Sequence, residues 1–314
     1  MRIGNPELSV VVPISERHDD IRELYQLYSD ELTKMGKSFE FIFVVDGYFQ
    51  AAFDELKKIK SEGHPVRIVK FPKNFGESVA LMEGFQRARG EVVLTLASYL
   101  QIEPKDLSKV FAAYEEGADL VVTRRYPRKD PFINKLQSNT YHYLLRRLTG
   151  SPFRDITSGM RLIKKRILSE IVLYGDLHRF IPILALQKGF KVKEVDVAHR
   201  KEDTHLRLVN PGIYLRRVLD ILTLFFLVKF TKKPLRFFGL IGSFLFLIGS
   251  ALSIALSIEK IFTSAQLSNR PLLLLGILFM VFGIQTLSVG LVGELIIYSH
   301  AKEINEYTIE KIIE

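Results

Sequence analysis

Two long stretches near the C-terminal end of the sequence contain no charged residue. Each is 22 residues long, and they run over Phe237–Ile258 and Pro271–Val292. As α-helices they would each extend about 33 Å, which is enough to cross a hydrocarbon layer about 30 Å thick. Two buried core helices of a soluble domain are the alternative. The short polar connection between the stretches favours a two-helix transmembrane hairpin over residues 237–298.

The charges that flank these stretches predict how the hairpin is oriented. The connecting loop carries only two basic residues, Lys260 and Arg270. Six basic residues precede the first stretch: Arg216, Arg217, Lys229, Lys232, Lys233 and Arg236. Because positively charged flanks remain in the cytoplasm, we expect a multi-pass cell-membrane protein with residues 1–236 and the tail 299–314 on the cytoplasmic side. The N-terminal MRIGNPELSV has no apolar signal-peptide core, which agrees with this orientation.

Residues 216–236 include an apolar segment, Val218–Phe230, that is too short to span a bilayer. The adjacent lysines favour a helix at the membrane interface, and a core helix of the preceding domain is the alternative. The net charge of +9 therefore indicates a membrane surface and phosphorylated ligands rather than nucleic acid, for which the sequence has no motif. The absence of Cys excludes disulfides, thiolate metal sites and a cysteine nucleophile.

Residues 1–215 alternate between apolar, β-branched runs and amphipathic helical patterns. The runs predict strands at Leu8–Val12, Phe41–Val45, Val66–Phe71, Glu91–Leu96, Asp119–Thr123 and Val192–Val197. The helical patterns include Asp19–Lys34, Glu77–Ala88 and Lys105–Glu116. Apolar strands separated by helices are typical of an α/β fold with a mostly parallel sheet covered on both faces. Ligands of such sheets bind beyond the carboxyl ends of the strands, so we expect the functional residues there.

An ordered series of motifs follows these strands. They read SVVVPISER, FVVDG, NFGES, GFQRARGEVVLTL, DITSGMRLIKK and HRFIPILALQKGFKVKEVDVAHR, with KPLRFFGLIGS and LLGILFMVFGIQTLSVGLVGEL in the apolar part. In this order the chain resembles the family 2 glycosyltransferases of the dolichol-phosphate mannose synthase and polyprenyl-phosphate glycosyltransferase type. The resemblance implies a GT-A-like, nucleotide-sugar transferase domain at residues 1–215.

The resemblance also implies roles for single residues. Arg124, Arg125 and Arg128 would bind the phosphate of the lipid acceptor, since guanidinium groups can grip phosphate through paired hydrogen bonds; a solvated basic loop is the alternative. Asp155 is the remaining carboxylate best placed for catalysis, with a turn cap as the alternative, and it would position groups because an ionised phosphate acceptor scarcely needs a general base. The donor-binding residues would be Pro13, Ile14, Glu16, Asp46, Gly76, Ser98, Gln101, Arg179, His199 and Arg200.

One motif departs from the family pattern. Related enzymes have Asp-x-Asp-Leu-Gln after the fourth expected strand, and its carboxylates hold a divalent cation on the donor diphosphate. Here the segment is Ala97–Gln101 (ASYLQ), which lacks both carboxylates that a hard cation prefers. Glu103 is expected to start the next helix rather than to replace them. We therefore predict no metal at this position and expect the counter-charge to come from Arg179, Arg200 or nearby lysines.

Three explanations of this departure stay open: a metal-independent enzyme, a different sugar donor such as a lipid-linked sugar, or a loss of transferase activity. Two functions follow. The first is transfer of a sugar from a nucleotide-sugar to a polyprenyl phosphate on the cytoplasmic face. The second is a non-catalytic membrane subunit that keeps the fold and binds lipid or a partner. A homo-oligomer is also expected, because a two-helix anchor exposes much apolar surface.

Overall fold

The computed structural model describes residues 6–128, 143, 145–147, 149–171, 173, 175–200, 219, 222–226, 234–263 and 271–300. The chain divides into two compact units, Met1–Leu224 and Phe225–Glu314. Most of the expected interfacial helix at 216–236 lies outside the described residues, as does the expected tail beyond residue 300.

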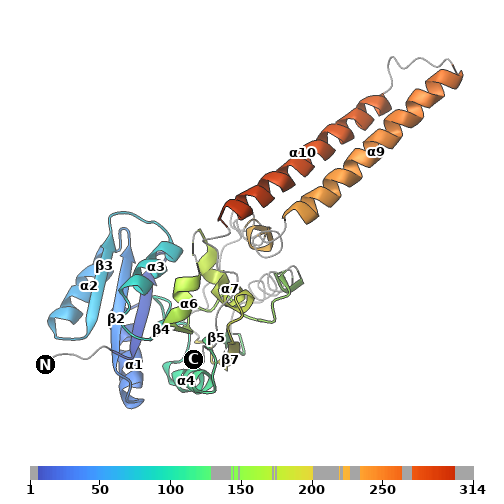
Figure 1. Ribbon diagram of the computed structural model, residues 1–314. Helices are drawn as coiled ribbons and strands as arrows, with labels where there is room; N and C mark the ends of the chain where they lie inside the picture. Colours follow the sequence, from blue (N-terminus) through green and yellow to red (C-terminus); the bar gives the residue numbers. More distant parts are fainter. Residues whose placement is uncertain are drawn as a thin grey trace. The chain divides into compact units, whose positions relative to one another are not determined.

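A seven-stranded sheet forms the centre of the first unit (Figure 1). Its strands are β1 (Leu8–Ile14), β2 (Phe39–Asp46), β3 (Val66–Phe71), β4 (Val92–Thr95), β5 (Leu120–Arg125), β6 (Arg161–Lys164) and β7 (Val192–Val197). They are arranged in the order β3-β2-β1-β4-β6-β5-β7. Every residue of β1 is buried, which explains why this strand reads as an unbroken apolar run.

The sheet is mixed rather than uniformly parallel. β1 runs parallel to β2 and β4, β2 parallel to β3, and β5 parallel to β7. β6 lies antiparallel to both of its neighbours, β4 and β5. The six strands expected from the sequence are confirmed, whereas β6 was not predicted: its four residues begin and end with charged side chains and show no apolar run.

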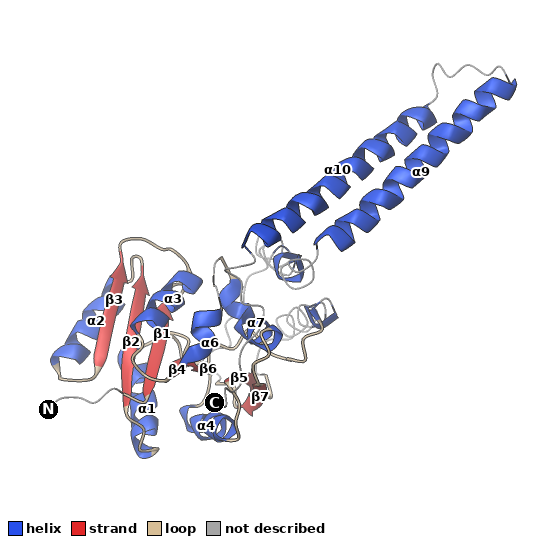
Figure 2. Cartoon of the chain, viewed as in Figure 1, coloured by secondary structure: helices blue, strands red, loops and turns tan. Residues whose placement is uncertain are grey.

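Helices connect the strands and cover the sheet (Figure 2). In chain order they are α1 (Ile21–Lys34), α2 (Gln50–Ser61), α3 (Glu77–Arg87), the 3₁₀ turn η1 (Pro104–Asp106), α4 (Leu107–Glu115), α6 (Lys165–Glu170), the 3₁₀ turn η2 (Leu177–Phe180) and α7 (Ile181–Gln187). The Asp20 carboxylate caps α1 by accepting hydrogen bonds from the backbone N–H groups of Arg22 and Glu23. Such a cap satisfies helix donors that have no partner within the helix.

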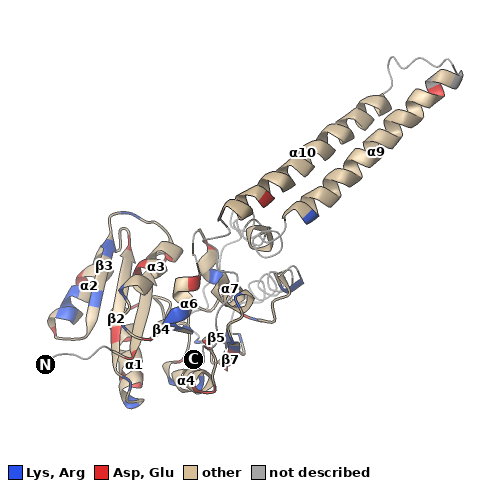
Figure 3. Ribbon diagram, in the orientation of Figure 1, with Lys and Arg blue, Asp and Glu red and all other residues tan. Residues whose placement is uncertain are grey.

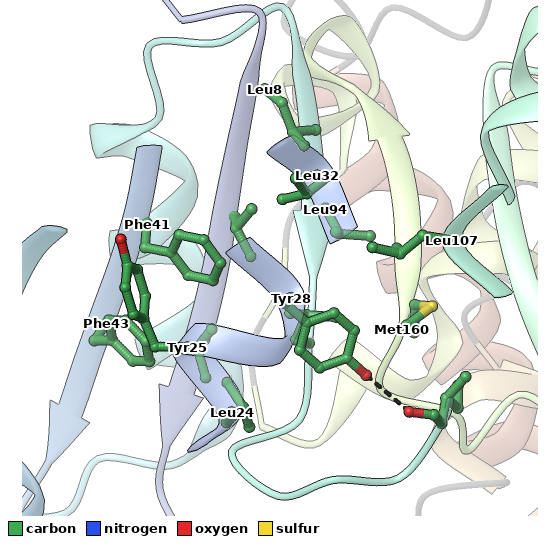
Figure 4. Packing of buried hydrophobic residues seen from close by; sticks show 14 of the residues in the cluster. Leu8, Leu24, Tyr25, Tyr28, Leu32, Phe41, Phe43, Leu94, Leu107 and Met160 are labelled. Atoms are coloured by element: carbon green, nitrogen blue, oxygen red, sulfur yellow. Dashed lines mark hydrogen bonds between the residues drawn. The ribbon is translucent and has the colours of Figure 1, made fainter. Parts of the chain in front are cut away.

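Alternate residues of the central strands point to opposite faces, and different helices bury them. Val10 and Val12 join α1 and α4 in the main core, where Tyr28 and Leu32 pack with Phe41 and Phe43 of β2 (Figure 4). Val11 faces α3, where a Cβ added at Gly84 would lie 2.3 Å from its Cγ1 atom. A glycine is required there because α3 lies so close to β1.

Tyr28 links this core to the loop after β4. Its hydroxyl donates a hydrogen bond to the carbonyl oxygen of Ile102 at 3.1 Å, drawn as a dashed line in Figure 4. Burial raises the pKa of the Tyr28 phenol, so the group stays protonated and remains a donor. The core therefore anchors the loop that carries the expected donor-binding residues.

The second unit contains the helices α9 (Pro234–Thr263) and α10 (Pro271–His300). Both are long and apolar enough to be candidate membrane spans, with mean hydropathies of 2.1 and 2.3. Their charged residues lie toward the helix ends (Figure 3). Each begins with a proline, which is favoured in the first turn because no helix partner is required for its nitrogen.

Glycines bring α9 and α10 into backbone contact. A Cβ added at Gly242 would lie 2.6 Å from the carbonyl oxygen of Gly283, and one added at Gly249 would lie 2.4 Å from that of Gly276. The seven-residue spacing on both helices repeats the contact every two turns, as in coiled coils. Without water to drive apolar groups together in a bilayer, such close packing holds helices in contact.

Replacing Gly249 with Leu should therefore separate the two helices. The new side chain cannot fit against Gly276, so we expect a loss of about 1–3 kcal/mol of hairpin stability. Thermal unfolding of the full chain in detergent, followed by circular dichroism, measures this loss. Gly239→Leu is the matched control, because a Cβ at Gly239 meets only Leu235 of its own helix. Equal unfolding temperatures for the two variants would contradict the packing described here.

Candidate active site

The candidate site lies at the carboxyl edge of β1, β2, β3 and β4. In the strand order β3-β2-β1-β4 the chain first adds strands on one side of β1 and then crosses to the other side. Such a change of side marks the place beyond the strand ends where α/β proteins bind ligands. Pro13 and Ile14 form the end of β1, and the exposed Glu16 follows in its loop.

The Asp-Gly and Asn-Phe-Gly motifs form one structure at this edge. The Asp46 carboxylate is fully buried and accepts hydrogen bonds from the backbone N–H groups of Phe75 at 2.7 Å and Gly76 at 2.8 Å. The Asn74 side-chain amide donates to the carbonyl oxygens of Ser15 and Asp46. Asp46 and Gly76, which were predicted separately, are therefore direct partners.

This arrangement explains the glycine that follows Asp46. Gly47 has a φ of +100°, and a Cβ added to it would lie 3.0 Å from the backbone nitrogen of Asn74. A larger residue would be strained by its backbone conformation and crowded by the neighbouring loop. Tyr48 follows with 88% of its side chain exposed, so its ring is available to a ligand at the rim of the site.

The loop after β4 is held by Ser98 and Gln101. Ser98 donates a hydrogen bond from Oγ to the carbonyl oxygen of Arg17 at 2.5 Å, and its own carbonyl oxygen accepts one from the backbone of Asp19. Gln101 donates from Nε2 to the Tyr99 hydroxyl and accepts at Oε1 from the backbone N–H of Gly159 at 2.9 Å.

The predicted residues His199 and Arg200 join the same loop. The backbone N–H of Arg200 donates to the carbonyl oxygen of Gln101 at 3.1 Å, and His199, which is fully buried, pairs with Ile102 through a β-bridge. Glu103 precedes the helical turn η1, with Pro104 as its first residue, as expected from the sequence. These contacts bring together the ends of β1, β4 and β7.

Arg17 lies beyond the carboxyl end of β1, where functional residues were expected, but no individual role was predicted for it. Its guanidinium carbon lies 3.8 Å from the centre of the Tyr99 ring, and its Nη2 atom lies 3.8 Å from Oδ1 of Asp19. A charged residue in the loop after the first strand is the signal that could have identified it. Only the structure reveals that this loop lies against the aromatic ring of the next one.

Asp155 is buried and occupied by other groups of the protein. Arg125 donates to it from Nε at 2.8 Å and from Nη2 at 3.0 Å, each hydrogen bond reaching a different carboxylate oxygen. The backbone and hydroxyl of Thr157 also donate to Oδ1. Both carboxylate oxygens are occupied by donors of the protein, so the geometry favours a positioning role over that of a general base.

The ion pair between Arg125 and Asp155 corrects the role expected for Arg125. Arg125 was expected on a loop that contacts the acceptor phosphate, but it is the last residue of β5 and only 3% of its side chain is exposed. Successive residues of a strand point to opposite faces, so Arg124 lies apart from it. Arg124 is 3.5 Å from Asp196 and stacks 4.6 Å from the Tyr126 ring. Arg128 lies beyond the strand and is partly exposed.

A second buried charge, Arg161, lies at the start of β6. It donates hydrogen bonds to the carbonyl oxygens of His178 at 2.8 Å and Ile156 at 3.1 Å. Burial lowers the pKa of Arg161 to about 10, which still leaves the guanidinium charged at neutral pH. This side chain joins the segment after Asp155 to the segment that carries the predicted residue Arg179.

Glu77, in the first turn of α3, faces this cluster. Nε2 of His178 lies 3.3 Å from its carboxylate, and Nδ1 of the same ring lies 2.9 Å from Oγ of Ser78. Burial opposes ionisation of Glu77, but its interactions with His178, Arg161 and Arg179 outweigh this effect and lower its pKa from 4.5 to about 2. Arg179 therefore helps to keep Glu77, in the first turn of α3, ionised.

The residues at the end of β4 do not fit a divalent cation. Ala97 carries a methyl group, and the Tyr99 phenol accepts a hydrogen bond from Gln101 while Arg17 covers its ring. Neither side chain is a ligand for a hard cation. Within the described part of the chain there is no group of three or more His, Cys, Asp or Glu side chains that could hold a metal ion.

Comparisons with known proteins show which sequences and folds this chain is similar to. Residues 9–172 match the family described as Glycosyl transferase family 2. The dodecaprenyl-phosphate galacturonate synthase of Rhizobium johnstonii is 28% identical, and the match covers 95% of this chain and 89% of that protein. The undecaprenyl-phosphate 4-deoxy-4-formamido-L-arabinose transferase of Pectobacterium atrosepticum is 31% identical, with 98% and 93% covered.

Solved structures share the fold at lower identity. Glucosyl-3-phosphoglycerate synthase from Mycobacterium tuberculosis, in complex with Mn²⁺ and UDP-glucose, has a TM-score of 0.52 and 18% identity, over 70% of this chain and 79% of that one. Mannosyl-3-phosphoglycerate synthase from Rubrobacter xylanophilus has a TM-score of 0.54 and 14% identity, over 69% and 72%. These likenesses confirm the expected GT-A-like fold.

The buried ion pair makes a prediction about stability. Arg125→Met should lower the free energy of unfolding by about 3–5 kcal/mol, because it leaves the Asp155 carboxylate buried without its partner. The double variant Arg125→Met with Asp155→Leu should recover much of this loss. Denaturant unfolding of the full chain in detergent tests both. Arg124→Met is the control and should cost at most about 1 kcal/mol. A double variant no more stable than Arg125→Met would contradict this view of the pair.

Glu77 makes a separate prediction about acid stability. A carboxylate whose pKa falls from 4.5 to about 2 on folding adds stability above pH 4.5, and that contribution disappears as the pH falls toward 2. Glu77→Gln should therefore unfold at a lower temperature than the wild type at neutral pH, and the difference should shrink toward pH 2. The exposed Glu91→Gln serves as the control, with no comparable dependence on pH expected. A difference that stays constant with pH would refute the role of Glu77.

Proposed function

The chain belongs to glycosyl transferase family 2, and on that premise we propose that it transfers a sugar from a nucleotide-sugar to a polyprenyl phosphate. The observation that carries the proposal is similarity over nearly the whole chain, apolar helices included, to transferases whose names specify polyprenyl-phosphate acceptors. Such an acceptor is a membrane lipid. The candidate spans α9 and α10 would hold the chain in the same bilayer.

The loops at the ends of β1, β2 and β4 support a nucleotide-sugar donor. Hydrogen bonds join the loops that carry Glu16, Asp46 and Gln101, and the exposed Tyr48 ring follows Asp46. An exposed aromatic ring suits a nucleotide base, which can stack on it, whereas the Asp46 carboxylate holds the backbone of Phe75 and Gly76 in place. The basic flank before α9 supports placing this domain on the cytoplasmic side.

The reaction requires one bond to form and one to break. An oxygen of the lipid phosphate attacks the anomeric carbon of the sugar, and the bond from that carbon to the donor diphosphate breaks. The nucleoside diphosphate leaves with the electron pair. Because a phosphate monoester is largely ionised at neutral pH, no side chain has to remove a proton from the acceptor. Asp155 then serves to hold Arg125 and the Thr157 segment in place.

Arg124 and Arg128 are the proposed contacts for the acceptor phosphate. Arg124 is partly exposed, and its link to Asp196 at 3.5 Å is a weak, partly solvated ion pair that a phosphate can replace. Arg128 follows it on the segment that leaves the same strand. Arg125 stays bound to Asp155 and is excluded from this role.

The proposal can be tested by assaying the full chain in nanodiscs that contain undecaprenyl phosphate. We expect transfer from one member of a panel of UDP- and GDP-sugars, with a glycosylated lipid phosphate as product. Arg124→Ala should raise the KM for the lipid about tenfold or more, because a charge-assisted hydrogen bond contributes about 1.5–3 kcal/mol and 1.4 kcal/mol is tenfold. Lys57→Ala, on the exposed face of α2, is the control.

The assay also separates the two functions considered from the sequence. Binding of nucleotide and lipid without transfer from any donor would favour the non-catalytic membrane subunit. An unchanged KM for the lipid in a folded Arg124→Ala variant would reject only the acceptor contact. The similarity to named transferases supports the enzyme, whereas the missing carboxylates at Ala97 and Tyr99 are the observation behind the alternative.

A further inference from the structure

The segment after β4 lacks the residues that would hold a cation beside the donor diphosphate. A leaving nucleoside diphosphate carries several negative charges, and transferases of this kind place a divalent cation beside it with the carboxylates of their Asp-x-Asp motif. In this chain the two positions hold Ala97 and Tyr99, which do not fit that cation. Some other positive group has to lie at this point if the diphosphate is to bind and leave.

We propose that the guanidinium group of Arg17, stacked on Tyr99, binds the donor diphosphate directly and takes the place of the metal. The inference rests on the proposed function, because it concerns the donor of that reaction. Arg17 contacts the residue at the second carboxylate position itself, with 3.8 Å between the guanidinium carbon and the ring centre. The positive charge therefore lies where the family pattern would place a cation.

Both members of the pair are held by their neighbours. The Tyr99 hydroxyl accepts a hydrogen bond from Gln101, and the carbonyl oxygen of Arg17 accepts one from Ser98. The two loops are thus fastened to each other beside the stack. A group positioned in advance stabilises developing charge without having to reorganise during the reaction.

The geometry of a stacked guanidinium suits a diphosphate. Stacking uses the face of the group, whereas its N–H donors lie in its plane. Nε and Nη2 of Arg17 are buried beside the loop after β4, and 30% of the side chain is exposed. Arginine can donate two parallel hydrogen bonds to one phosphate group and stays charged at any physiological pH. A lysine at this position would supply the charge but neither the planar stack nor the paired donors.

Acidic groups beside Arg17 do not cancel its charge. Oδ1 of Asp19 lies 3.8 Å from Nη2, which is longer than a hydrogen bond, and about a third of each side chain is exposed. Oδ2 of Asp19 is directed at the backbone N–H of Leu100, at 3.4 Å. Glu16 is exposed at the rim. Because the contact with Asp19 is longer than a hydrogen bond, a diphosphate can displace Asp19.

The structure gives the other cations considered from the sequence different surroundings. Arg179 contributes to the positive field around Glu77 at the start of α3. The backbone N–H of Arg200 donates to the carbonyl oxygen of Gln101. Arg17 is therefore the cation with a direct, described contact to the altered motif.

The test compares the affinities for nucleoside diphosphates and monophosphates, so that their difference reports the contribution of the second phosphate. UDP, UMP, GDP and GMP are titrated by calorimetry against the full chain in nanodiscs with EDTA present. Arg17→Met should weaken binding of the preferred diphosphate about tenfold or more, the loss expected for one charge-assisted contact, and leave the monophosphate within about threefold. Arg87→Met, which removes an exposed charge at the far end of α3, should change neither. Unfolding temperatures verify that each variant is folded.

Two further variants test the stack itself. Arg17→Lys should recover only part of the diphosphate affinity. Tyr99→Leu should weaken diphosphate binding on its own and reduce the effect of Arg17→Met when the two changes are combined, because the pair acts as one unit. Additive effects of the two changes would overturn the role of the Tyr99 ring.

The remaining outcomes are distinguishable. If the wild type binds none of the four nucleotides, the proposed donor class is wrong and the inference fails with it. If the wild type binds a diphosphate and Arg17→Met binds it equally well, only the inference fails. If EDTA weakens wild-type binding and Mn²⁺ restores it, a metal is present and Arg17 does not replace it. Loss of that Mn²⁺ dependence in Asp19→Asn would identify Asp19 as its ligand.

Discussion

The hydrogen bonds of Gln101 are the contacts on which the candidate site depends. This single residue binds the Tyr99 hydroxyl, the backbone of Gly159 and the backbone of Arg200. The three partners come from distant parts of the sequence. A buried amide left without partners would be costly, so the bonds of Gln101 keep the end of β4, the segment after Asp155 and the end of β7 in one arrangement.

Buried charges provide the second level of organisation. The pair formed by Arg125 and Asp155 and the guanidinium of Arg161 lie inside the domain, where an uncompensated charge would be strongly destabilising. Each is matched to carboxylate or carbonyl oxygens of another segment. Such pairs tolerate little displacement, so they fix where the polar loops lie against the apolar sheet.

Much of this fold could be predicted from the sequence because its central strands are buried on both faces and each candidate span contains 22 consecutive residues without charge. β6 could not, since its burial depends on β4 and β5 rather than on an apolar pattern of its own. The site also has features that the sequence predicts and features that only the fold explains. Asp46 and Gly76 were found by their motifs, but their mutual contact follows from the fold. The burial of Arg125 depends on a carboxylate thirty residues later, and the position of Arg17 depends on a ring in another loop, so local sequence carries no sign of either.

The antiparallel strand β6 has a consequence for how this domain can change over time. β5 ends and β6 begins at the same edge of the sheet, so residues 126–160 leave the sheet and return to it at one place. Lengthening the connection between β5 and β6 alters no strand register and adds only a small loop-closure entropy. The end of this segment is nevertheless fixed, because Asp155 and Thr157 bind Arg125 and Gly159 binds Gln101 at the end of β4. Changes in length are therefore expected ahead of Asp155 rather than after it.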